Sequence, residues 1–133
     1  MKLTYDVVKQ RFNDFILEEV FIQDDQPSFY LYQQIKNGNI YTGIIGRSSV
    51  EDYNNGVIKI HEHTLTEREE KLKEYLDVCN FNAEPVLFSY ENLPNVDDIV
   101  NIVMLNEPEW DFSTTDRARH KLWVISNAKQ VAA

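Results

Sequence analysis

The chain of 133 residues is acidic, because 13 Lys and Arg stand against 22 Asp and Glu and give a formal net charge of −9. Nucleic acid and anionic membrane surfaces attract proteins through clustered cations, so this charge argues against both as partners. With 43% hydrophobic residues the chain can bury enough surface to fold, which excludes a disordered acidic tail. The length fits a single domain.

The N-terminus and the cysteine content indicate the compartment. Lys2 is followed by Asp6 with no apolar core between them, so the signal-peptide pattern is missing. No apolar run approaches the ~20 residues that a membrane span requires. Cys79 is the single cysteine, which rules out an internal disulfide and a cysteine metal cluster. We therefore expect a cytoplasmic protein.

The first elements predicted are a helix and a β-hairpin. Residues 5–20 carry apolar side chains at three- and four-residue spacing, which is typical of an amphipathic helix. Residues 28–35 and 40–46 are rich in aromatic and branched side chains. Asn37-Gly38 between these two runs is a strong signal for a hairpin turn.

The second half of the chain alternates between predicted strands and helices. In chain order, the pattern predicts a short strand at 56–60, a helix at 66–78, a buried strand at 85–90, a helix at 95–104, a loop at 106–117 and a strand at 119–125. We expect an α+β fold, with residues 1–133 as a single domain. In that fold a mixed or antiparallel sheet, including the hairpin at about 28–46, is packed by three helices.

The most unusual segment is His61-Glu62-His63-Thr64, directly before a predicted helix. His61 and His63 would share one face of an extended chain, a spacing that two metal ligands can use. No further histidine or cysteine lies nearby in the sequence, so we favour a solvated strand end or helix cap and expect no metal. A helix N-terminus also attracts anions, which gives a second interpretation: Glu62 as the base or magnesium ligand of a phosphoryl reaction.

A second candidate is the concentration of positive charge at Arg117, Arg119 and His120. Such a group can hold a phosphate or a carboxylate. The more common interpretation is that of strand-edge charges, which discourage aggregation. Arg47 is a similar isolated cation.

Several segments, in the same order along the chain, resemble a prokaryotic family catalogued as domain of unknown function 1015. The most specific of them spans residues 43–65. It contains Val50-Glu51-Asp52-Tyr53, Gly56-Val57-Ile58 and His61-Glu62-His63-Thr64. Further similarity lies at residues 29–34, 85–90 and 120–125.

The chain also departs from this family. Glu70-Lys71 stands about where the family carries an Asp-Arg pair. Family proteins are much longer and contain a later Asp-Gly-His-His-Arg motif, similar to the nucleotide-using motif of sulfiredoxin-like and ParB-like folds, which this chain lacks. Ser126 or Asn127 would also cap a helix that is cut short at Ala133. We therefore expect a fragment of a longer protein that is inactive by itself.

The resemblance implies a small-molecule enzyme, phosphoryl-transferring or nucleotide-dependent, and family genes that neighbour those of serine biosynthesis suggest a serine-related substrate. A nucleotide and magnesium are implied as cofactors for the full-length protein only. In this chain we expect Glu62 and His61 to be catalytic, and Thr64, Arg47 and His120 to bind the substrate or its phosphate. The alternative is a non-catalytic structural or oligomerisation domain, in which residues 61–63 only cap a helix.

Overall fold

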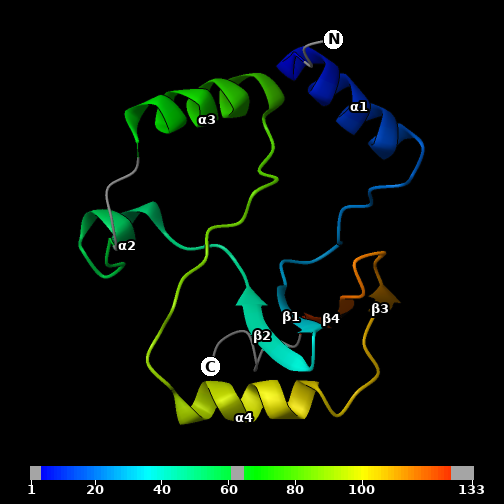
Figure 1. The fold of residues 1–133 in the computed structure, drawn as a ribbon. Coiled ribbons are helices and arrows are strands. Elements are labelled where there is room, and N and C mark those ends of the chain that lie inside the picture. Colours follow the sequence, from blue (N-terminus) through cyan, green and yellow to red (C-terminus); the bar gives the residue numbers. More distant parts are fainter. Residues whose placement is uncertain (1–3, 61–64, 127–133) are drawn as a thin grey trace. The chain divides into compact units, whose positions relative to one another are not determined.

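The computed structural model of the chain describes residues 4–60 and 65–126. It contains a four-stranded antiparallel sheet and four helices, which confirms the predicted α+β class (Figure 1). The chain forms two compact units. The first consists of Met1–Gln23 with Val50–Ser89, and the second of Asp24–Ser49 with Tyr90–Ala133.

The first unit is helical, with α1 (Tyr5–Leu17), α2 (Val50–Asn54) and α3 (Thr66–Cys79). Helices α1 and α3 pack together, and aromatic rings form much of their contact. The rings of Phe12 and Phe81 stack with their centroids 3.9 Å apart, and Tyr5 meets Tyr75 edge-on at 5.8 Å. Cys79 is buried beside this cluster, with its thiol 3.5 Å from the carbonyl oxygen of Tyr5. The helix predicted at 66–78 is thus confirmed.

Helix α1 ends at Leu17, so the prediction that it continues to residue 20 was wrong. Glu19 has a φ of 57°, a left-handed conformation that cannot continue a right-handed helix. The backbone N–H groups of Val20 and Phe21 fold back to donate to the carbonyl of Phe15, at 2.8 and 3.1 Å. This turn satisfies a carbonyl at the helix end.

The second unit is built on the sheet, whose strand order is β2-β1-β4-β3. Its strands are β1 (Phe29–Lys36), β2 (Asn39–Ile45), β3 (Trp110–Ser113) and β4 (Arg119–Ile125). Asn37 and Gly38 form the predicted two-residue turn between β1 and β2, both with positive φ, at 52° and 80°. This backbone conformation matches the twist of the flanking strands, which confirms the hairpin.

Helix α4 (Pro94–Val103) covers one face of this sheet. Its buried Val103 packs in a core with Leu31, Trp123 and Ile125, three buried side chains from the two central strands. The N–H of the Trp123 indole donates a hydrogen bond of 2.9 Å to the carbonyl of Asn106, so its one polar group is satisfied. The helix predicted at 95–104 is confirmed.

The opposite face of the sheet carries a different set of side chains, which the strand register brings together. Directly paired residues of an antiparallel sheet lie on the same face, and so do residues two apart on one strand. By this rule the face carries Tyr32, Tyr41, Gly43, Phe112, His120 and Leu122. We call it the His120 face.

Three predicted elements were wrong. Residues 56–60 are not a strand, because Gly56 has a φ of 74° and the N–H groups of Val57 and Ile58 turn back to the carbonyl of Asp52, closing α2. Residues 85–90 have no regular structure and are exposed, with Leu87 at 96%. The loop predicted at 106–117 contains β3. In the part of the chain that the structure describes, no helix has the length and apolar character needed to span a bilayer.

Candidate functional site

The structure describes two of the five predicted site residues. Arg47 is exposed just beyond β2, and His120 lies half-buried on β4. The other three, His61, Glu62 and Thr64, lie outside the described residues. Their roles therefore stay predictions, and the geometry of a candidate site is that around His120.

His120 is held through both nitrogens of its ring. Its Nδ1 lies 2.7 Å from the Oη of Tyr32 on β1, and its Nε2 lies 3.1 Å from the Oγ1 of Thr114, which follows β3. The ring of Phe112 stacks on the imidazole with 5.1 Å between centroids and 21° between the planes. Two hydroxyl groups and one aromatic ring thus fix the orientation of the imidazole.

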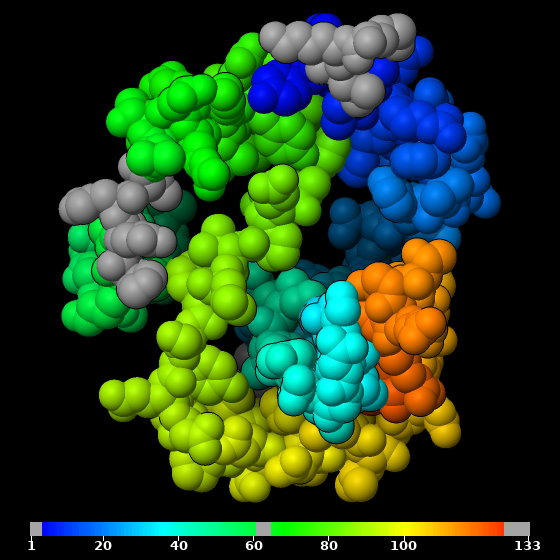
Figure 2. Space-filling model, in the orientation of Figure 1, coloured from blue at the N-terminus to red at the C-terminus, as the bar shows by residue number. Residues whose placement is uncertain are grey.

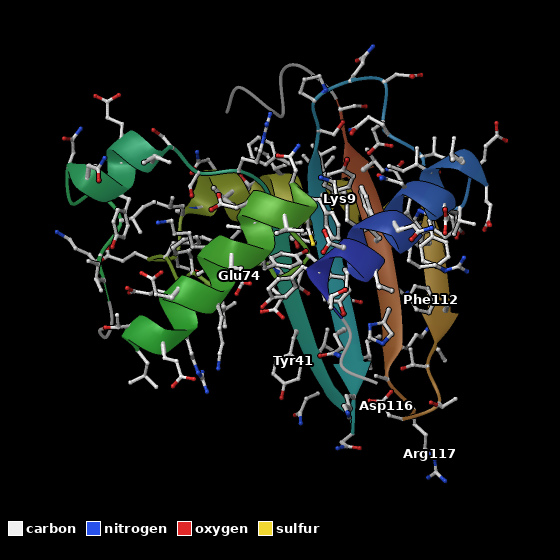
Figure 3. All side chains as sticks on the ribbon, turned by 90° about the horizontal axis from the view of Figure 1, so that it is seen from above. Lys9, Tyr41, Glu74, Phe112, Asp116 and Arg117 are labelled. Atoms are coloured by element: carbon white, nitrogen blue, oxygen red, sulfur yellow. The ribbon has the colours of Figure 1, made fainter. Side chains whose placement is uncertain are left out.

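The hydrogen bonds continue beyond Thr114 to the end of the sheet. The hydroxyl of Thr114 donates to Oδ1 of Asp116, and Oδ2 of Asp116 accepts from Nζ of Lys36 at 2.6 Å. Asp116 lies in the turn between β3 and β4, next to Arg117 (Figure 3). Figure 2 shows this turn (orange) lying beside the β1–β2 hairpin (cyan). The resulting network joins Tyr32, His120, Thr114, Asp116 and Lys36 from strands β1 and β4 and the turn between β3 and β4.

The direction of these bonds assigns the tautomer of His120. The hydroxyl of Thr114 has two oxygen acceptors, the carboxylate of Asp116 and, at 3.1 Å, the carbonyl of Ala118, so its single hydrogen is used there and its oxygen can accept from an Nε2–H. The other nitrogen, Nδ1, then accepts the hydrogen of the Tyr32 phenol. In this tautomer Nδ1 of His120 accepts a hydrogen bond from Tyr32, so it is placed to act as a base toward the phenol.

Asp116 carries a negative charge within the network and is paired with Lys36. Hydrogen bonds from Lys36, from the Thr114 hydroxyl and from the backbone N–H of Ala118 lower the pKa of Asp116. Its carboxylate is therefore ionised at neutral pH. It accepts the hydrogen of the Thr114 hydroxyl and has no hydrogen of its own to donate. The network thus runs from a phenol to a fixed carboxylate.

Open space lies next to Tyr32 on the His120 face. Tyr32 pairs with Gly43 of β2, and a Cβ added at Gly43 would meet no atom within 4 Å. The flanking side chains of β2 on the same face, Tyr41 and Ile45, are exposed by 60% and 42%. Gly43 therefore leaves a gap on the His120 face between the side chains of Tyr41 and Ile45, at the position of β2 that pairs with Tyr32.

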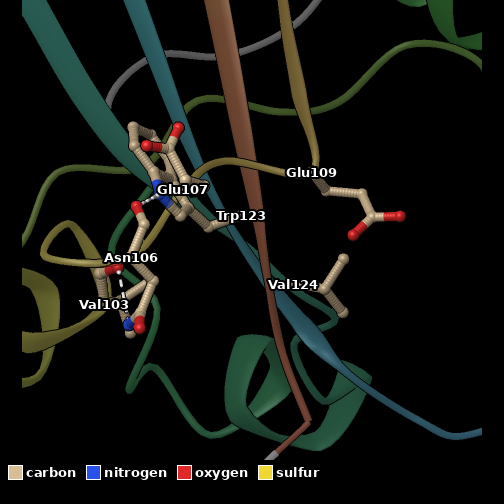
Figure 4. A pocket seen from close by; sticks show the side chains of 6 residues that line it. All are labelled: Val103, Asn106, Glu107, Glu109, Trp123 and Val124. Carbon is tan, nitrogen blue, oxygen red and sulfur yellow. Dashed lines mark hydrogen bonds between the residues drawn. The ribbon is translucent and has the colours of Figure 1, made fainter.

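Two hollows elsewhere in the second unit are lined by carboxylates. One, of about 190 Å³, lies between α4 and β4 and is bordered by Glu107 and Glu109 (Figure 4). Another, of about 320 Å³, is bordered by Asp24 and Asp25. Both would repel a phosphate. Across residues 4–60 and 65–126 there is no group of three or more His, Cys, Asp or Glu arranged to hold a metal ion.

Of the two arginines near His120, Arg119 is paired with a neighbouring carboxylate. Both guanidinium contacts of Arg119 go to the carboxylate of Asp111, each at 2.7 Å, and the Arg119 hydrogen bond lowers the pKa of Asp111. This pair joins β3 to β4 on the face that α4 covers. Arg117 lies in the turn with a φ of 62°. The interpretation of Arg119 as a strand charge fits this contact.

Sequence reasoning found His120 and missed its partners. Tyr32 is 88 residues away in the chain, and Thr114 and Asp116 lie in a segment predicted as a loop. The sequence contains one usable signal. Side chains alternate between the two faces of the sheet along β4, which places His120 on the face opposite Trp123.

Comparison with known proteins gives a family and no function. No curated protein and no solved structure matches the sequence. One family model matches, and it spans residues 1–133, which agrees with the resemblance carried by residues 43–65. The chain therefore belongs to the family described as "Protein of unknown function (DUF1015)".

Proposed function

We propose that the intact protein is a cytoplasmic small-molecule enzyme that transfers a phosphoryl group to or from a hydroxyl, and that this chain supplies part of its site. The observation that carries the proposal is the fixed ring of His120, which contacts the hydroxyl of Tyr32 through Nδ1 and that of Thr114 through Nε2. Positioned bases of this kind are what hydroxyl chemistry requires. The reaction class itself comes from the resemblance, and a serine-related substrate from the neighbourhood of family genes.

The residues outside the described part complete the proposal. We assign Glu62 as the base or magnesium ligand, His61 as a donor to the phosphate and Thr64 as a hydroxyl that binds the substrate or its phosphate. The N-cap position of α3 is occupied by Leu65 and not by Thr64. Arg47 is a further cation for the substrate. A nucleotide and magnesium act in the full-length protein, where the metal would neutralise phosphate charge.

The test is a phosphoryl-transfer assay of the full-length protein with phosphoserine, and with serine plus ATP or ADP and magnesium. Glu62→Gln should lower kcat by ~100-fold or more with the Tm unchanged, because it removes a proton acceptor or metal ligand and leaves the size of the side chain intact. Glu74→Gln, an exposed glutamate of α3, is the matched control and should keep full activity. Absence of turnover with every substrate, or an active Glu62→Gln variant, would reject the proposal.

The second candidate is a non-catalytic structural or oligomerisation domain. It is favoured by the two hollows of the second unit, whose carboxylates are unsuited to a phosphorylated substrate. Under this alternative, Glu62→Gln changes the Tm and there is no activity to lose. The same pair of variants therefore separates the two candidates.

A further inference from the structure

We propose that Tyr32 is the catalytic nucleophile of the His120 face, with His120 as its base and Thr114 and Asp116 as positioning residues. The proposal rests on the proposed function, since the electrophile it assigns is the phosphoryl group of a small phosphate ester or nucleotide.

The first argument is the contact between the phenol and the imidazole. The Oη of Tyr32 lies 2.7 Å from Nδ1 of His120, a short and direct hydrogen bond between two half-buried side chains. A tyrosine hydroxyl is a weak nucleophile at neutral pH and needs an adjacent base to remove its proton as it attacks. His120 has its acceptor nitrogen at that position.

The second argument is the group behind the base. An activated nucleophile is recognised by a base that is itself oriented by a third group. Here Nε2–H of His120 donates to Thr114, and the hydroxyl of Thr114 donates to ionised Asp116. When His120 takes up the proton, the carboxylate stabilises the new positive charge through Thr114. Lys36 holds the carboxylate from its other side.

The strand next to Tyr32 leaves open space on the His120 face. The pairing of Tyr32 with Gly43 leaves the neighbouring strand without a side chain, and a Cβ at that position would meet no atom within 4 Å. The β2 side of Tyr32 is therefore open on the His120 face, and a ligand could lie there beside the tyrosine. Gly43 has no positive φ, so conformational strain does not require glycine there.

In the proposed step the phosphoryl group moves from its leaving oxygen to the phenol of Tyr32. The Oη of Tyr32 forms a bond to phosphorus while the bond from phosphorus to the leaving oxygen breaks, and that oxygen departs with the electron pair. The phenolic proton passes to Nδ1 of His120, which becomes an imidazolium and then gives the proton to the departing oxygen. Transfer to an acceptor hydroxyl reverses the sequence and restores Tyr32.

The nucleophilicity of Tyr32 is tested by treating the full chain with N-acetylimidazole. The rate of acetylation of each tyrosine is then measured by peptide mass spectrometry. In this reaction Oη attacks the acetyl carbon, the carbon–nitrogen bond breaks and imidazole leaves with the phenolic proton. Tyr41 is the internal control, because it lies on the same face and is 60% exposed. We expect Tyr32 to be acetylated at least ~10-fold faster than Tyr41, although the side chain of Tyr32 is less exposed.

Four variants separate activation of Tyr32 from its mere exposure. His120→Gln should slow the acetylation of Tyr32 to the rate of Tyr41 or below, and Thr114→Val should slow it partly, with rescue by Thr114→Ser. Gly43→Val should slow it by filling the gap. Tyr41 should react at an unchanged rate in the His120 and Thr114 variants, which also reports that the sheet is folded.

The proposal is overturned if Tyr32 of the wild-type chain reacts no faster than Tyr41. It is also overturned if a folded Thr114→Val or His120→Gln variant keeps the full Tyr32 rate. Because the reagent replaces any natural substrate, the proposed function and this inference fail separately. Slow acetylation rejects Tyr32 as nucleophile whatever the phosphoryl assay gives, and a failed phosphoryl assay with fast acetylation rejects only the phosphoryl electrophile.

Discussion

The ring of Phe29 occupies the space that a side chain at Gly46 would need. A Cβ built on Gly46 would lie 2.5 Å from one carbon of this ring and 2.6 Å from another. Phe29 opens β1 and packs against the core formed by Leu31 and its neighbours, so its ring cannot turn away without losing those contacts. Gly46, directly after β2, thus allows the backbone to approach the ring of Phe29.

The first prediction concerns this contact. Gly46→Ala should lower the free energy of unfolding by about 1–3 kcal/mol, because the added methyl group overpacks the ring of Phe29. Urea unfolding followed by circular dichroism measures the change. Gly43→Ala is the matched control on the same strand, where a Cβ meets nothing, and should leave stability equal or slightly higher. Equal stability of the two variants would contradict the prediction.

The hairpin and the three longer helices follow from local signals in the sequence. Asn37-Gly38 predicts the turn because both positions need a positive φ, which these residue types tolerate. Apolar spacing predicts α1, α3 and α4 because each helix carries its apolar side chains along one face, which packs against neighbouring residues. These features need no knowledge of a distant partner.

Strand β3 could not be predicted, because its reasons are not local. All of Trp110–Ser113 is exposed, and the segment is a strand because it pairs with β4, where Asp111 meets Arg119. Residues 85–90 present the opposite case: an apolar run that has no regular structure. Strand preference depends on a partner surface, which a single sequence does not reveal. For the same reason sequence found His120 but not Tyr32, which the pairing of β1 with β4 brings to it.

The second prediction concerns the end of α1. Glu19 adopts a φ of 57°, a conformation that costs free energy for a residue with a Cβ and almost none for glycine. Glu19→Gly should therefore raise the stability of the first unit by about 0.5–1 kcal/mol.

The neighbouring residue supplies the control for this variant. Glu18 has a φ of −81°, so Glu18→Gly gains no relief of strain and should destabilise the protein through backbone entropy. Thermal unfolding followed at 222 nm measures both. A lower Tm for Glu19→Gly would show that the left-handed turn is not what ends α1 in solution.

The third prediction concerns the pH dependence of the ion pair between Asp116 and Lys36. Hydrogen bonds from Lys36 and Thr114 lower the pKa of Asp116 in the folded protein below the ordinary carboxyl value near 4. A carboxyl with a lowered pKa stabilises the folded state in its ionised form. This contribution is complete above about pH 4 and is lost as the pH falls from there through the lowered pKa.

Asp116→Asn should accordingly be less stable than wild type at pH 7, and the difference should shrink as the pH is lowered below about 4. Added salt should also reduce the difference at pH 7, because the side chains of both partners are about half exposed and their charges are screened. Urea unfolding at pH 7, 4 and 2.5 measures the effect. Asp25→Asn, in the exposed segment before β1, is the control and should show a much smaller change at pH 7. A stability difference for Asp116→Asn that stays constant from pH 7 to 2.5 would mean that the carboxylate charge does not hold this end of the network.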